Sequence, residues 1–280
     1  MKRRNFLKLI TKGAILGLFA PKALAAVSKT SPATSWEKHD DHIKDYLHKM
    51  RNFNRHYEGD IYLDGKQYRL LKSAVKRLYR LQRTVGHGNF YLLNFDDAIK
   101  VARNYSQVDR FPERELDFME MIFYEDGGLY GFFGEKPLKN LTDRIKRREV
   151  FKVPHTGNYL YKGVPSETYT KLKQDVGHQL ILTSGVRSIM KQFLLFLNKA
   201  YTSRGNLSVA SRSLAPPGYS LHGVGDFDVG QVGFGIANFS SRFTTTKVFK
   251  RLRDFGYIKL RYPKGNLLGV RFEPWHIKVN

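Results

Sequence analysis

The residues best suited to do chemistry lie in two segments near the carboxyl end of the chain. The first segment, residues 218–230, contains His222 and two aspartates, and the second, residues 273–276, begins with Glu273 and ends with His276. Two imidazoles, a carboxylate and a further glutamate are what a hydrolytic zinc site needs: three protein ligands, an open position for water and a base beside it. The two segments therefore suggest a site for one zinc ion, whose bound water would have a pKa lowered to roughly 7.

Two carboxylates compete for the place of the third ligand. Asp226 and Asp228 both lie an even number of residues from His222, so side-chain alternation along an extended segment does not choose between them. A segment bent at Gly225 would bring His222 and Asp228 onto one ion. The alternative is that His222 and His276 are unrelated histidines, each satisfied within the core, because the chain contains nine histidines.

Glu273 precedes His276 by three residues. Residues three apart in an ideal strand point to opposite faces, so the two side chains would not share a site on regular strand geometry. If both face the ion, the backbone must be irregular at Pro274.

A single arginine lies in a turn between two elements that the sequence predicts to be rigid. Arg187 belongs to the turn at 184–188, which follows an apolar strand expected at 180–183 and leads into a helix expected from Ile189 to about Ala200. Rigid elements on both sides favour a fixed role facing a ligand. A structural salt bridge to an acid explains the same arginine equally well.

The elements that must position these residues predict an α+β fold. Helical patterns fill the chain up to about residue 150, whereas residues 151–280 alternate irregularly between strands and helices with hairpin-like links. We expect a helical amino-terminal region at 26–150, followed at 151–280 by a mainly antiparallel sheet flanked by helices. Further strands are expected at 206–213, 257–262 and 269–279, and further helices at 164–177 and 245–254.

Composition excludes some chemistries and leaves others open. The chain has no cysteine, which excludes disulfides, cysteine-ligated zinc and a cysteine nucleophile. Its 48 basic residues exceed its 25 acidic ones, and the formal charge of +23 implies a polyanionic neighbourhood. Nucleic acid, anionic lipid and an acidic cell-wall polymer all fit that description, and charge alone does not choose between them.

Residues 1–25 have the three-part layout of a signal peptide. Arg3 and Arg4 precede Phe6-Leu7-Lys8 in a string that closely resembles a twin-arginine export signal. The apolar run at 14–20 is too short to span a bilayer, so we expect no transmembrane segment in the mature protein. We expect the twin-arginine export machinery as a partner, a mature protein that begins near Ala26, and a periplasmic or otherwise exported location. The alternative is a basic, amphipathic first helix that stays in place.

Three motifs occur in order in the carboxyl-terminal half. They are Ser-Gly-Val-Arg-Ser at 184–188, Gly-Tyr-Ser-x-His extended to an aspartate at 218–228, and Glu-Pro-Trp-His at 273–276. As an ordered set they resemble the D-alanyl-D-alanine carboxypeptidases of the VanY type, in the zinc peptidase group that also includes lysostaphin-like enzymes and hedgehog domains. The resemblance covers roughly residues 150–280 and implies that 151–280 is a zinc peptidase domain.

The resemblance also implies a ligand set. His222, Asp228 and His276 would be the zinc ligands. The interval from His222 to Asp228 is one residue shorter than the family usually has, which keeps Asp226 as an alternative carboxylate. The Asp-apolar-Gly ending at 228–230 matches the family motif and favours Asp228.

The remaining roles follow from the same resemblance. Glu273 would be the general base, Arg187 would stabilise the developing oxyanion and orient the substrate, and Ser220 would help bind the substrate near its terminal carboxylate. The implied activity is removal of the terminal D-Ala from peptidoglycan stem peptides by attack of zinc-bound water.

Two other functions stay open, and a third is not expected. One is a peptidoglycan endopeptidase that cuts a crosslink between stems. The other is a non-catalytic wall-binding protein that keeps zinc for structure, although such a site has no need of Glu273. Nucleic-acid binding is not expected, because the export signal argues against it.

Overall fold

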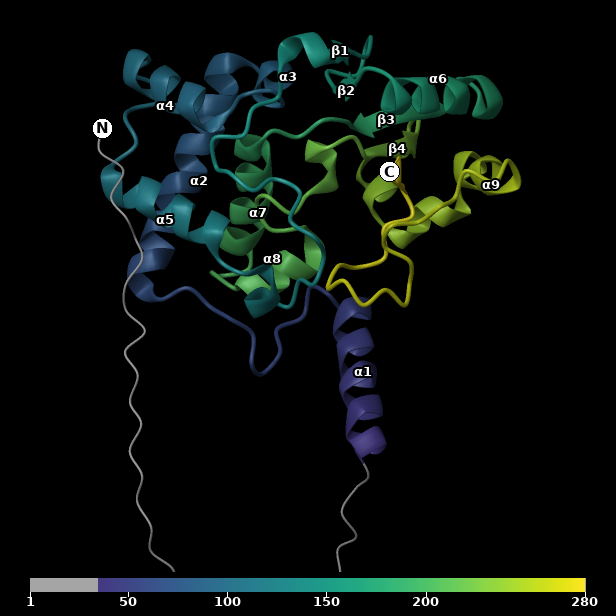
Figure 1. Ribbon diagram of the computed structural model, residues 1–280, viewed down its shortest axis with the longest axis horizontal. Coiled ribbons are helices and arrows are strands. Elements are labelled where there is room, and N and C mark those ends of the chain that lie inside the picture. The colour runs from purple at the N-terminus through teal and green to yellow at the C-terminus, as the bar shows by residue number, and fades with distance from the viewer. Residues whose placement is uncertain (1–34, 280) are drawn as a thin grey trace, which may run out of the picture. The chain divides into compact units, whose positions relative to one another are not determined.

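The structure is a computed structural model that describes residues 35–279, within which the chain from Asp41 onward forms one compact unit (Figure 1). The signal sequence expected at 1–25 lies outside the described residues and stays a prediction. None of the helices in residues 35–279 combines the length and the hydrophobicity that crossing a bilayer requires.

Helices make up the first part of the described chain, as the sequence predicts. They are α1 (Ser35–Arg51), α2 (Gly65–Val85), α3 (His87–Phe90), α4 (Phe95–Asn104) and α5 (Glu113–Tyr124). Local signals set their starts: Asp64 caps α2 in a reciprocal capping box with Gln67, and Asn94 accepts a hydrogen bond from the backbone of Asp97 at the start of α4. Short 3-10 turns follow at η1 (Gly127–Tyr130) and η2 (Arg147–Glu149).

Two small antiparallel sheets occupy the second part. Strands β1 (Val150–Lys152) and β2 (Tyr159–Tyr161) form one, and β3 (Leu180–Ser184), β4 (Phe227–Gln231) and β5 (His276–Ile277) form the other in the order β3-β4-β5. The helices here are α6 (Val164–Val176), α7 (Ile189–Thr202), α8 (Leu207–Ser213) and α9 (Lys247–Asp254). Short 3-10 turns lie at η3 (Leu221–Gly223), η4 (Gly235–Phe239) and η5 (Ser241–Thr245). The predicted fold class, α+β with a mainly antiparallel sheet and flanking helices, is confirmed.

Successive side chains of β4 point to opposite faces of the sheet, so its apolar residues face the core and Asp228 faces away from it. Phe227 and Val229 pack with residues of α6, α9 and β3 in one hydrophobic cluster, so Asp228 between them points to the other face. The pairing of β3 with β4 is irregular between Leu182 and Ser184, and this brings Ser184 opposite Asp228. The sheet thus presents polar side chains to the face that its core does not occupy.

A second cluster joins the helical part to the rest of the chain. Leu71, Leu78 and Leu81 of α2 pack with Phe193 and Leu197 of α7, and all five are fully buried. Residues from both sides of position 150 therefore share one core. The division expected between 26–150 and 151–280 stays a prediction.

Three expected strands are wrong in whole or in part. Residues 207–213 are the helix α8, because Asn206 caps it by accepting a hydrogen bond from the Val209 backbone, and the segment lies in the core. Residues 257–262 form no strand, and only His276–Ile277 of the stretch 269–279 does. The Arg271 backbone donates to the Arg212 carbonyl, and the Glu273 backbone donates to the Tyr262 carbonyl. These are single hydrogen bonds and not the repeated bonds of a sheet.

Substituting Leu78 with alanine tests the shared core. Removing this fully buried side chain should lower the free energy of unfolding by about 2–5 kcal/mol, because a cavity remains in the cluster. Denaturant unfolding followed by far-ultraviolet circular dichroism and tryptophan fluorescence should show one transition at lower denaturant. Lys72→Ala, at an exposed position of the same helix, is the control. A Leu78→Ala protein whose strand-rich part unfolds separately at the wild-type midpoint would contradict the account.

Candidate active site

Three side chains from three different elements meet on one face of the sheet β3-β4-β5, opposite the face that packs against its hydrophobic core. His222 lies in the turn η3, Asp228 in β4 and His276 in β5, where it pairs directly with Asp228. One ligand atom from each falls within 4.8 Å of the others, and all three residues are at most 3% exposed. His222 and His276 therefore lie in one cluster, as the zinc-site hypothesis requires, and not in separate parts of the core.

The hydrogen bond of His222 fixes which of its nitrogens faces the cluster. Its Nδ1 lies 2.8 Å from the carbonyl oxygen of Gly185, and because a carbonyl only accepts, Nδ1 carries the hydrogen. The lone pair then sits on Nε2, which lies 3.2 Å from Oδ1 of Asp228. Burial lowers the pKa of His222, which favours this neutral form.

His276 is held in the reverse orientation. Its Nε2 lies 2.9 Å from Oδ2 of Asp226 and donates to that carboxylate, while its Nδ1 lies 3.2 Å from Oδ1 of Asp228. Burial alone would lower the pKa of His276, but its bonds to the two aspartates outweigh burial and raise the pKa to about 9. Without a metal ion, a proton is therefore bound to Nδ1 of His276. A metal ion that binds this nitrogen must displace that proton.

The two aspartates have different positions. Asp226 precedes β4, accepts from His276 and Arg261, and also accepts from the Val279 backbone. It lies behind the imidazole, where it orients the ring in the way that outer carboxylates orient metal-bound histidines. Asp228 instead lies between the two ring nitrogens, so the geometry places it, rather than Asp226, at the centre of the cluster.

An unsatisfied buried oxygen shows that the cluster suits a cation. Oδ1 of Asp228 is buried and accepts no hydrogen bond of normal geometry among the described residues, although two imidazole nitrogens lie 3.2 Å away. Burial opposes ionisation of Asp228, but its interactions with the His222 ring and with the positive charge of Arg187 outweigh burial and hold its pKa well below the usual value. A carboxylate and two imidazole nitrogens that converge on one point match the donor set of a zinc site with an open position, once a metal ion displaces the proton of His276.

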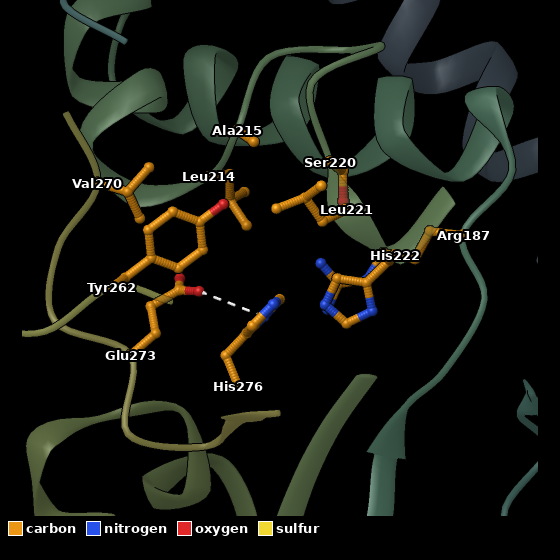
Figure 2. Close-up of a pocket in the computed structure, with 10 residues that line it drawn as sticks. All are labelled: Arg187, Leu214, Ala215, Ser220, Leu221, His222, Tyr262, Val270, Glu273 and His276. Carbon is orange, nitrogen blue, oxygen red and sulfur yellow. Dashed lines mark ion pairs between the residues drawn. The ribbon is translucent and has the colours of Figure 1, made fainter. Parts of the chain in front are cut away.

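Glu273 lies beside the cluster because the chain turns sharply before β5. Pro274 and Trp275 form a turn in which the His276 backbone donates to the Glu273 carbonyl at 3.3 Å. Oε2 of Glu273 consequently lies 3.9 Å from Nδ1 of His276, as the dashed line in Figure 2 marks. The turn at Pro274 is therefore the backbone irregularity that Glu273 and His276 need in order to face one site.

Burial and one arginine set the electrostatics of Glu273. Burial raises its pKa to about 7, and the nearby charge of Arg271 limits that increase. The guanidinium of Arg271 is packed between the rings of Phe53 and Trp275, 4.8 Å from each centroid, and its Nε lies 3.9 Å from Oε1 of Glu273. The aromatic stack thus fixes a positive charge behind the glutamate.

Arg187 contacts the cluster directly. Its guanidinium donates to Oδ2 of Asp228 through one nitrogen and to Oγ of Ser184 at 2.8 Å through Nε, while its backbone N–H donates to the His222 carbonyl. The turn can pass this close only because Gly185 has no side chain, since a Cβ there would lie 1.9 Å from the Tyr159 carbonyl oxygen. The acid that pairs with the arginine is thus the central carboxylate of the cluster.

A small pocket of about 30 Å³ opens onto the cluster. Figure 2 shows Tyr262, Glu273 and His276 on one side of it and Arg187 and His222 on the other. The expected substrate-binding residue, Ser220, is buried at this pocket, and the remaining lining residues are Leu214, Ala215, Leu221 and Val270.

Sequence reasoning missed Tyr262. Its ring packs edge-on against that of His276, with centroids 5.4 Å apart, and it is only 5% exposed. The Glu273 backbone donates to the Tyr262 carbonyl, and the Tyr262 ring packs with Phe132 and Tyr219, and no spacing in the sequence indicates these contacts.

Comparison with known proteins confirms the resemblance. Residues 166–279 match the family model VanY, D-alanyl-D-alanine carboxypeptidase, so this part of the chain is similar to metallopeptidases of the VanY type. No curated protein matches the sequence.

Three carboxypeptidase structures are among the solved structures that match the chain. The LdcB LD-carboxypeptidase is 21% identical over 52% of this chain and 66% of its own, with a TM-score of 0.37. A mutant of the vancomycin resistance D,D-pentapeptidase VanY with Zn(II) is 24% identical over 47% and 78%, with a TM-score of 0.37. VanYB in complex with D-alanine-D-alanine is 22% identical over 54% and 86%, with a TM-score of 0.39. The chain thus spans slightly less than two thirds of the LdcB chain.

Two matched substitutions separate the roles of the aspartates. Asp228→Asn should remove most zinc binding, because it neutralises the carboxylate between the two nitrogens. Asp226→Asn should weaken zinc binding by only about 10- to 100-fold, because it removes a partner that orients His276. Competition against a chromophoric chelator measures both affinities. Equal losses, or a larger loss for Asp226→Asn, would contradict the geometry.

Proposed function

We propose that the protein is a zinc-dependent peptidase that removes the terminal D-alanine from peptidoglycan stem peptides. The observation that carries the proposal is the convergence of three potential ligand atoms on a buried site, with a glutamate at the same opening. The family match of residues 166–279 supports the peptidase class and the peptidoglycan substrate.

His222, Asp228 and His276 would hold one zinc ion through Nε2, a carboxylate oxygen and Nδ1, respectively. When bound, zinc polarises the scissile carbonyl and lowers the pKa of a coordinated water. Asp226 and the Gly185 carbonyl keep the two imidazoles in the tautomers that present these nitrogens.

Glu273 would move the proton. Its carboxylate faces the same pocket as the ligand nitrogens and can accept a proton from the attacking water at an Oε atom. It can then deliver that proton to the leaving amine, as general acid–base catalysis requires. Arg271 behind it supplies a fixed positive charge, and the Phe53 and Trp275 rings hold that charge in place.

Arg187 and Ser220 would bind the substrate. The arginine side chain is 14% exposed at the pocket while one of its nitrogens remains on Asp228, so its other donors can reach a developing oxyanion. The Ser220 hydroxyl lies on the same pocket wall and would contact the peptide near its terminal carboxylate. Both groups are set by rigid neighbours, the turn before α7 and the turn η3.

We further propose the division of labour and the location that the sequence indicates. Residues 151–280 would carry catalysis, and the helices of 26–150 would support α7 through the shared core. Residues 1–25 would direct export by the twin-arginine route, so that the enzyme would work on the cell wall in the periplasm or otherwise outside the cytoplasmic membrane.

Digestion of a synthetic pentapeptide stem tests the proposal. The protein with zinc should release one alanine, read by mass spectrometry. Glu273→Gln should lower the rate by about 10²- to 10⁴-fold while zinc binding is kept, because only the proton acceptor is lost. Glu167→Gln, at an exposed position of α6, is the matched control and should keep full activity.

Three outcomes would contradict the proposal in different ways. Cleavage of crosslinked stems alone indicates an endopeptidase. Zinc binding without cleavage of any stem indicates a non-catalytic wall-binding protein. Full activity of Glu273→Gln removes the assigned base.

A further inference from the structure

The segment after β4 exposes aliphatic side chains that nothing among the described residues covers. Ile236 is 86% exposed and Val232 is 47% exposed. The two glycines between them, Gly233 and Gly235, have positive φ angles of 75° and 53°, which permit the tight loop that places both side chains outside the core. We call residues 232–236 the apolar tip.

The apolar tip is held rigidly at its base. Asn238 is buried and closes the loop, since its Oδ1 accepts from the Gln231 backbone at 2.8 Å and its Nδ2 donates to the Gln231 carbonyl at 3.1 Å. The Val232 backbone donates to the Gln179 carbonyl at 2.9 Å. Ile236 therefore projects from a fixed loop, and its exposure is built into the fold.

Basic residues outnumber acidic ones in the segment that contains and follows the apolar tip. Residues 232–259 contain one acid, Asp254, and six bases, which are Arg242, Lys247, Lys250, Arg251, Arg253 and Lys259. Neither Lys247 nor Lys250 forms an ion pair with a described carboxylate, and both are exposed. We call Arg242, Lys247 and Lys250 the basic belt.

Two contacts place the basic belt next to the apolar tip. The Arg242 guanidinium lies 5.7 Å from the centroid of the Phe234 ring, within the tip itself. The backbone of Val248, in the first turn of α9, donates to Oε1 of Gln231 at 3.2 Å. The start of α9, with Lys247, is thus tied to the residue from which the tip emerges.

From this combination we infer that the apolar tip and the basic belt dock on the surface of an anionic phospholipid bilayer. Exposed aliphatic groups gain free energy by entering the acyl boundary of a bilayer, and neighbouring lysines gain by contact with anionic headgroups. A hydrophilic polyanion would satisfy the bases but would leave Ile236 and Val232 in water. Nucleic acid is bound through aromatic stacking and phosphate contacts, whereas the two most exposed large side chains of the apolar tip, Ile236 and Val232, are aliphatic.

Docking here leaves the candidate active site free. Asp228 lies near the start of β4, whereas the apolar tip leaves the strand at its other end, after Gln231. Figure 1 shows α9 at the edge of the fold, beyond the sheet and on the far side from α4 and α5. A protein bound through this surface would keep its pocket open to substrate, and the inference does not depend on the proposed peptidase activity.

The absence of cysteine allows a direct test in the full chain. Ile236→Cys carries an environment-sensitive nitrobenzoxadiazole dye, and Leu129→Cys, at a position 58% exposed in η1, carries the same dye as the control. With vesicles of phosphatidylglycerol and phosphatidylcholine, the dye at 236 should shift to the blue and be quenched by nitroxide-labelled lipid. The dye at 129 should change little. Because the report is local, binding by other parts of the chain does not imitate it.

A charge-matched pair tests the basic belt. Lys247→Gln combined with Lys250→Gln should weaken vesicle binding measured at the 236 dye by roughly five-fold for each lysine removed. Lys72→Gln combined with Lys76→Gln removes the same charge from an exposed face of α2 and should have a much smaller effect. Vesicles of phosphatidylcholine alone should bind weakly.

The inference is overturned if the dye at 236 stays in water while the protein sediments with anionic vesicles. It is equally overturned if the two lysine pairs lower binding to the same extent, because the attraction would then be that of the whole basic chain. Loss of stem-peptide cleavage in these variants is not expected and would show damage to the fold instead.

Discussion

The pairing of Asp228 with His276 across β4 and β5 is the constraint on which the candidate site depends. It brings a carboxylate from one strand and an imidazole from another to neighbouring positions on one face, although the two residues are far apart in the chain. The rest of the cluster follows from it. His222 approaches from the turn η3, Glu273 from the turn before β5, and Arg187 from the turn before α7.

Such a cluster is costly to bury, and the surrounding structure offsets the cost by giving nearly every polar atom a partner. The Gly185 carbonyl and Asp226 take the outer hydrogens of the two imidazoles, and Arg187 takes the outer oxygen of Asp228. What remains is one carboxylate oxygen, Oδ1 of Asp228, which faces one ring nitrogen of each histidine. The outward-facing atoms of the cluster thus have hydrogen-bond partners, whereas the central carboxylate oxygen has none among the described residues. A bound cation would complete this arrangement.

Much of the fold could be predicted from the sequence because periodicity and end signals are local. The helices α2, α6, α7 and α9 follow apolar spacing, and the apolar run of β3 reads as a buried strand. The irregular segments could not be predicted, because Tyr262 and Val270 pack against Phe132 and Tyr219 rather than joining a sheet. Strand formation depends on a partner edge, and the sequence does not show where that edge lies.

The site could be predicted in part. Residue types and the ordered motifs pointed to the residues that meet in the pocket, and they left Asp226 and Asp228 as alternatives. Only the structure distinguishes these two positions, because it shows which nitrogen of His276 each one faces. Tyr262 and Arg271 were not identified at all, since their contacts with His276 and Glu273 arise from the chain's return in three dimensions.

The most direct measurement of the central claim is a crystal structure of the zinc-loaded protein with anomalous diffraction at the zinc edge. We expect one ion bound by Nε2 of His222, Nδ1 of His276 and a carboxylate oxygen of Asp228, with zinc–nitrogen distances of about 2.0–2.1 Å. Asp226 should remain hydrogen-bonded to Nε2 of His276 without touching the ion. An ion bound by Asp226, or one bound away from both histidines, would contradict the central claim.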